Sequence, residues 1–126
     1  MEMRTPLGRV RGLGTAKEGV EHWWMQRLTS VALVPLVIWF VFQAVGLAGA
    51  DLVDFKFWLG HHANALLMVL LVVTLFHHAQ LGMQVVIEDY VHHEGVKTGA
   101  IVAVKFLAIV CAFSSVLAVL RLAFSV

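Results

Sequence analysis

The sequence predicts an all-α membrane protein that crosses the bilayer three times. Its 126 residues are 60% hydrophobic and only 13% charged, a composition outside the usual range of soluble domains. Three apolar stretches are each long enough to span a hydrocarbon core of about 30 Å as a helix. The few charged residues gather near the ends of these stretches. We therefore expect one helical domain inserted in a membrane.

The N-terminal segment, residues 1–27, is polar and basic, and we expect it to lie at the cytoplasmic surface. Five of the nine lysines and arginines precede or begin the first apolar stretch. Because positive residues favour the cytoplasmic side of a membrane, this bias predicts a cytoplasmic N-terminus. Three spans then place the C-terminus in the periplasm.

Residues 28–126 form the predicted transmembrane domain, with helices at about residues 28–48, 61–87 and 99–124. Pro35 lies inside the first helix, where a membrane protein tolerates it and where we expect a bend. The connection at 49–60 alternates acidic and aromatic residues and predicts an interfacial turn, whereas 88–98 is expected to be a loop. Lys105 is expected to extend toward the headgroups. Three thin helices bury little surface, so we expect a partner subunit to pack against them.

The second predicted helix carries polar residues that are costly in hydrocarbon. At about 100° per residue, two neighbouring stripes form. The first contains His78, Gly82 and Asp89, and the second contains His77, Gln80, Gln84 and Glu88. A charged or coordinating group at this depth costs about 2.5–3.5 kcal/mol on insertion scales and is rarely left without a partner. The helix is therefore expected inside a bundle.

A neutral imidazole inside a helical bundle is a suitable axial ligand for haem iron, and a nearby small residue lets the macrocycle approach. His78, with Gly82 one turn later, meets this requirement. His77 is chemically an equal candidate, and a histidine that only bonds a neighbouring helix is the simpler alternative. Because the first and third predicted helices contain no histidine, a second axial ligand would come from another chain.

Two further candidates lie at the cytoplasmic end of the second helix. The Tyr90 hydroxyl could donate a hydrogen bond to a quinone carbonyl, and Asp89 could take part in proton delivery. The alternative is an interfacial tyrosine beside a solvated carboxylate. The single cysteine, Cys111, excludes an internal disulfide and a cysteine-based metal site.

These motifs resemble a known family. The segment HAQLGMQVVIEDYV, residues 78–91, and the shorter segment QRLTS, residues 26–30, are similar to the small cytochrome b-type hydrophobic membrane anchor of bacterial succinate dehydrogenase, which is respiratory complex II. The length and the three-span layout agree with that family over the whole chain.

The resemblance implies a haem b shared between two anchor subunits, with His78 as the axial ligand from this chain. It further implies that Tyr90 bonds ubiquinone, that Asp89 lines the same pocket, and that Arg27 lies near the haem propionates. Without the resemblance, Arg27 is equally well explained as an interfacial cation. The sequence departs from the better-known enteric pattern at Glu21, where that pattern has a histidine, although His22 follows directly.

The implied function is that of a membrane anchor subunit of succinate:ubiquinone oxidoreductase in the bacterial inner membrane, which links the tricarboxylic acid cycle to electron transport. The chain itself would not oxidise succinate. Its implied partners are a flavoprotein, an iron–sulfur subunit and a second membrane anchor of the cytochrome b556 type, and no nucleic acid is expected. Two rivals remain at this point. One is a haem-free anchor, and the other is a small channel or transporter component that uses the second polar stripe.

Overall fold

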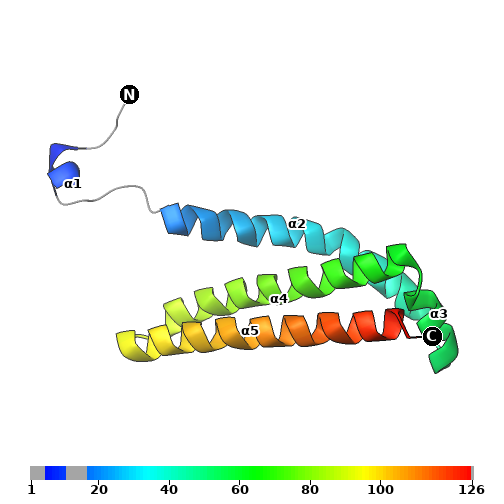
Figure 1. Ribbon diagram of the computed structural model, residues 1–126. Helices are drawn as coiled ribbons and strands as arrows, with labels where there is room; N and C mark the ends of the chain where they lie inside the picture. Colours follow the sequence, from blue (N-terminus) through cyan, green and yellow to red (C-terminus); the bar gives the residue numbers. More distant parts are fainter. Residues whose placement is uncertain (1–4, 11–16, 126) are drawn as a thin grey trace.

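The computed structural model describes residues 5–10 and 17–125, and this part of the chain is helical with no strands. Its helices are α1 (Pro6–Val10), α2 (Lys17–Gly46), α3 (Leu52–Leu59), α4 (His62–Tyr90) and α5 (Glu94–Ala123) (Figure 1). Within the described residues, three segments are long and apolar enough to cross a membrane, namely Val20–Gly46, His62–Tyr90 and Glu94–Ala123. The predicted all-α class and the three transmembrane helices are confirmed.

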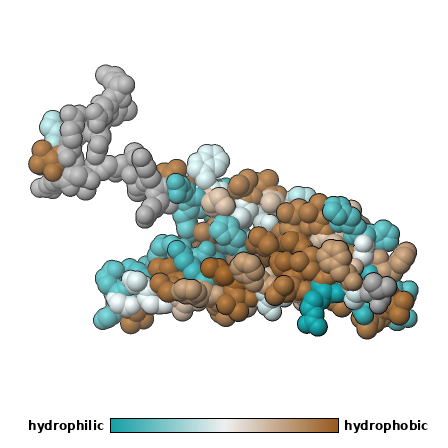
Figure 2. Space-filling model, in the orientation of Figure 1, coloured by the Kyte–Doolittle hydropathy of each residue, from teal (hydrophilic) through white to brown (hydrophobic). Residues whose placement is uncertain are grey.

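Helix α4 is the centre of the arrangement. It packs against both α2 and α5, whereas α2 and α5 do not contact each other within the described ranges. Figure 1 shows α4 and α5 running side by side from their shared connection. Few side chains are buried; the apolar ones are Leu33, Leu59, Leu71, Leu81, Ile87 and Val119. Figure 2 shows hydrophobic side chains over much of the visible face, as expected where lipid or other subunits replace water.

Helix α2 begins at Lys17, well before residue 28, where the sequence analysis placed the start of the first helix. The apolar stretch does begin near Leu28. The helix starts earlier, because residues 17–27 include several good helix formers and no proline. Residues 17–27 therefore belong to α2. Arg4 and Arg11, two of the basic residues on which the predicted cytoplasmic N-terminus rests, lie outside the described residues.

The helix continues through Pro35, and its axis changes direction in its second half (Figure 1). A turn then follows in which Gly49 has a φ of 83°. This left-handed conformation costs glycine little because it has no Cβ. The turn leads the chain from α2 into α3.

The predicted interfacial turn is the helix α3. The side chain of Asp51 caps it by accepting a hydrogen bond from a backbone N–H of the first turn. Trp58 then joins three elements. Its Nε1–H donates to Gln43 Oε1 of α2 at 2.7 Å, its ring stacks on Trp39 with centroids 6.0 Å apart, and its carbonyl accepts from Asn64 Nδ2 at 2.9 Å. Helix α3 thus fixes the ends of α2 and α4 together.

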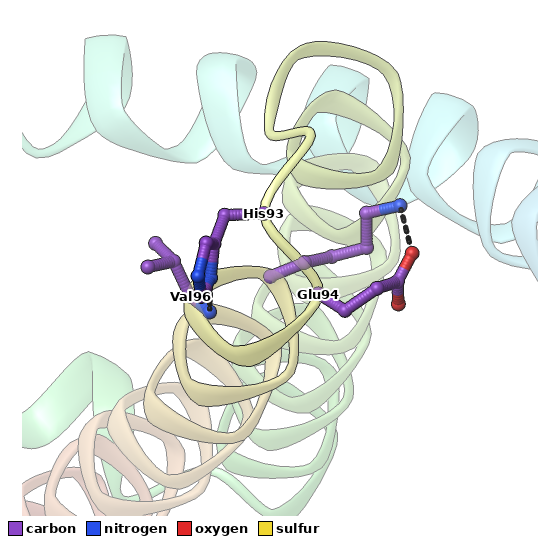
Figure 3. A network of polar contacts seen from close by, with 4 residues as sticks. His93, Glu94 and Val96 are labelled. Carbon is purple, nitrogen blue, oxygen red and sulfur yellow. Dashed lines mark hydrogen bonds and ion pairs between the residues drawn. The ribbon is translucent and has the colours of Figure 1, made fainter.

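The predicted loop at residues 88–98 is much shorter in the structure, because α4 continues to Tyr90 and α5 begins at Glu94. The early start of α5 has a local cause. The His93 side chain accepts a hydrogen bond from the Val96 N–H at 3.2 Å, and Lys97 Nζ lies 3.5 Å from Glu94 Oε1 (Figure 3). This cap and this i,i+3 pair stabilise the first turn.

The Trp58–Gln43 hydrogen bond gives a stability prediction. Replacing Trp58 with Phe keeps an aromatic ring but leaves Gln43 Oε1 without its donor, so we expect a loss of about 1 kcal/mol. Unfolding of the purified protein by SDS in mixed micelles measures this change. The control is Trp24→Phe, at an exposed ring, where the change should stay within about 0.5 kcal/mol. Equal losses of stability in the two variants would contradict a stabilising role for the Trp58–Gln43 hydrogen bond.

Candidate functional site

The candidate site is centred on His78, which makes a side-chain hydrogen bond between two membrane helices. Its Nδ1 lies 2.9 Å from Thr29 Oγ1 of α2. Thr29 is buried, with 6% of its surface exposed, and its hydroxyl also lies 2.7 Å from the Met25 carbonyl and 3.1 Å from that of Gln26. No hydrogen bond within the described residues engages Nε2 of His78. That nitrogen remains available to another group.

Thr29 was missed by the sequence analysis, although it lies in the QRLTS segment. Threonine commonly bonds a carbonyl of its own helix, so its sequence alone gives no sign of a partner on another helix. One weak signal in the sequence was the spacing of four residues between Thr29 and the apolar Leu33, which places the two side chains on the same face of a helix. Leu33, one turn later, is buried as well, which places Thr29 on the packed face of α2.

Two more polar residues share this face of α2. His22 and Gln26 precede Thr29 at helical spacing, and both carry a buried atom without a hydrogen-bond partner, namely His22 Nε2 and Gln26 Oε1. A Cβ built at Gly82 would lie 3.9 Å from Gln26 Nε2, so Gly82 faces the same region. Buried polar atoms without partners cost about 1–3 kcal/mol each. The pair therefore points to a polar group supplied from outside the described residues.

The structure separates the two adjacent histidines. His78 faces Thr29 of α2, whereas His77 is exposed and lines a groove of about 520 Å³ between α4 and α5. Gln80 and Lys105 line the same groove among mostly apolar residues. Adjacent residues on a helix differ by about 100° in direction, so the two imidazoles meet different surroundings.

The second polar stripe forms hydrogen bonds within its own helix. Gln80 Nε2 donates to Gln84 Oε1 at 3.2 Å, and Gln84 Nε2 donates to Glu88 Oε1 at 3.1 Å. These i,i+4 pairs satisfy part of the hydrogen-bonding capacity of the stripe. They also support the continuation of α4 beyond residue 87, where the sequence analysis ended it.

Asp89 and Tyr90 lie in the last turn of α4 and are exposed, with 78% of the Tyr90 surface accessible. Neither side chain has a hydrogen bond or ion pair to any residue that the structure describes. Twelve residues at about 1.5 Å each separate Tyr90 from His78 by about 18 Å along the helix. The structure does not bring this pair together with His78, and it leaves both side chains free to meet a ligand or another chain.

Arg27 is exposed, and its guanidinium carbon lies 5.4 Å from the ring centroid of Trp23. Two residues of helix separate it from Thr29, which corresponds to about 200° around α2. Arg27 therefore lies on a different face from the His78 contact. Glu21 is also exposed, whereas the neighbouring His22 has its Nε2 buried beside the packed face.

No group of three or more His, Cys, Asp or Glu side chains within residues 5–10 and 17–125 could hold a metal ion. A haem iron differs from such a site because one chain needs to supply only a single axial imidazole. The residues around His78 fit one edge of such a group, since Nε2 is not engaged, Gly82 has no side chain, and two buried polar atoms lack partners.

Three apolar helices, with an imidazole held at the contact between two of them, define a polytopic helical membrane protein. The model of the succinate dehydrogenase/fumarate reductase transmembrane subunit family matches residues 1–117. The chain belongs to this family, and the resemblance stated from the sequence is confirmed.

Curated relatives agree with the family assignment. A succinate dehydrogenase hydrophobic membrane anchor subunit from Rickettsia bellii is 33% identical over 119 residues, covering 94% of each chain. The subunit of the same name from Paracoccus denitrificans is 32% identical over 109 residues, covering 84% of this chain and 82% of its own length. A succinate dehydrogenase membrane anchor subunit from Reclinomonas americana is 31% identical over 97 residues, or 74% and 80% of the two chains. No solved structure matches.

The family assignment and the three apolar helices identify a multi-pass protein of the bacterial inner membrane. Membership also implies that the chain works in a complex with other succinate dehydrogenase subunits. The alignment covers nearly the full length of the Rickettsia bellii relative.

Proposed function

We propose that this anchor subunit helps to hold haem b and forms one wall of the site where ubiquinone is reduced to ubiquinol. The observation that carries the proposal is the hydrogen bonding of the two ring nitrogens of His78. Its ring is fixed by Thr29 through Nδ1, while Nε2 has no partner in the described part of the chain. An imidazole oriented in this way at a membrane helix contact is suited to bind iron in the axial position.

His78 would be the axial ligand from this chain, and the second anchor subunit would supply the other. When bound, the haem supplies a one-electron redox centre within the membrane. His22 and Gln26 would offer their unpartnered atoms to polar groups at its edge, and Gly82 would leave space beside the ring. Arg27 is a further candidate for the propionates because a guanidinium is well shaped for carboxylates.

Tyr90 and Asp89 would act at the quinone. The Tyr90 hydroxyl donates a hydrogen bond to a quinone carbonyl, which stabilises the negative charge that develops on this oxygen as electrons arrive. Asp89, beside it in the same exposed turn, can pass protons from the cytoplasmic side to the reduced quinone. Two electrons and two protons complete the conversion to ubiquinol.

The electrons would come from succinate by way of the flavoprotein and iron–sulfur partners, so this chain would have no part in succinate oxidation itself. Tyr90 and Asp89 are exposed at the end of α4 that is expected to be cytoplasmic, where such partners would dock. The rival channel function receives less support, because Gln80, Gln84 and Glu88 bond one another along one helix and the groove that Gln80 lines is mostly apolar.

The two histidines provide the test of haem binding. We expect His78→Leu to remove the b-type absorption band from the reduced-minus-oxidised spectrum of the purified complex, since it removes the imidazole that faces Thr29 of α2. His77→Leu is the matched control and should retain the band, because His77 faces the groove between α4 and α5. A band that survives in His78→Leu would contradict the haem assignment and favour a haem-free anchor.

The Tyr90 hydroxyl provides the test of the quinone site. We expect Tyr90→Phe to lower succinate:ubiquinone activity by at least about tenfold, the value of a hydrogen bond worth roughly 1.4 kcal/mol in the transition state. Succinate oxidation by a soluble artificial acceptor should stay largely unchanged. His92→Ala, an exposed change two residues later, serves as the control. Equal loss of both activities in Tyr90→Phe would instead indicate a defect in assembly.

A further inference from the structure

We infer that Thr29 is a positioning residue for His78, which fixes the tautomer of its imidazole so that the Nε2 lone pair is presented to iron. This inference rests on the proposed haem function. It concerns a residue that donates no ligand itself and acts through the ring on the neighbouring helix.

The hydrogen bonds around Thr29 favour one direction for the Thr29–His78 bond. A hydroxyl has one hydrogen to donate, and Thr29 has two carbonyl acceptors within reach on its own helix, at 2.7 Å and 3.1 Å. With its hydrogen given to one of these carbonyls, Thr29 Oγ1 accepts from His78 Nδ1–H at 2.9 Å. A neutral imidazole carries only one N–H, so Nε2 holds a lone pair. This tautomer is the one that ligates a metal through Nε2.

The surroundings hold this arrangement in place. Thr29 is buried, so water does not compete for its hydroxyl. Its branched side chain has few χ1 rotamers in a helix. Leu33, one turn later on α2, and Leu81, three residues after His78 on α4, are buried beside the contact. The hydrogen bond therefore forms on the buried faces of both helices.

The bond also has an electronic consequence. An N–H that donates to an oxygen makes the opposite ring nitrogen a stronger base and a stronger electron donor to a metal. A stronger donor favours the ferric state over the ferrous state, so the Thr29 contact lowers the midpoint potential of the haem. A hydrogen bond that merely joined two helices would affect stability without changing the potential.

The test compares variants of the assembled complex. Thr29→Val keeps the branched shape but removes the hydroxyl, and Thr29→Ser keeps the hydroxyl. Ser30→Ala is the matched control, because Ser30 bonds the Gln26 carbonyl of its own helix. The readouts are the haem content per complex, the rate of haem loss to a scavenging apoprotein, and the midpoint potential from an optical redox titration.

We expect Thr29→Val to raise the midpoint potential and to weaken haem retention by about 10- to 100-fold, the range found for loss of an outer partner of a ligand. Thr29→Ser and Ser30→Ala should match the unaltered complex in both measurements. If Thr29→Val prevents assembly, Thr29→Ala replaces it with the same readouts.

The inference would be overturned if Thr29→Val left both the midpoint potential and the haem retention unchanged. It would also be overturned if Thr29→Ser altered them as much as Thr29→Val does. These outcomes are distinct from failure of the proposed function. If His78→Leu loses the b-type band while Thr29→Val remains normal, haem binding stands and only the role of Thr29 is wrong. If His78→Leu retains the band, the haem part of the proposed function itself fails.

Discussion

The structure depends on the requirement that polar groups in hydrocarbon find partners within protein. The central example is the contact between His78 and Thr29, which joins α4 to α2 through a buried hydroxyl. In water, such a bond would contribute little because the solvent could replace either partner. Within a membrane the alternative is an unsatisfied polar group, so the contact fixes how the two helices face each other.

The same requirement is met differently around α4. The stripe that contains Gln80, Gln84 and Glu88 bonds along its own helix, whereas His78 needs α2 as its partner. His22 and Gln26 keep buried atoms that no described residue satisfies. Because α5 lies apart from α2 within the described ranges and buries few side chains, the arrangement suits a chain whose remaining polar groups and apolar surface are completed by other subunits.

Much of the fold and part of the site could be predicted from the sequence. The composition and the three apolar stretches predicted the three spans, because the thickness of a bilayer fixes the length of a spanning helix. The helix ends were less predictable. The extension of α2 to Lys17 and the start of α5 at Glu94 depend on helix formers and on the His93 cap, where hydropathy carries no information. The choice between His77 and His78 rested on a resemblance, since spacing alone treats two adjacent histidines alike.

The sequence by itself determined the class of protein, the number of spans and the family, because these follow from the apolar pattern and from short motifs along one chain. Only the tertiary structure decided which histidine faces α2 and that Thr29 is its partner. The physical reason is that a helical repeat gives the direction of each side chain relative to its own axis. It does not give the rotation of one helix against another, which is set by packing between residues far apart in the chain.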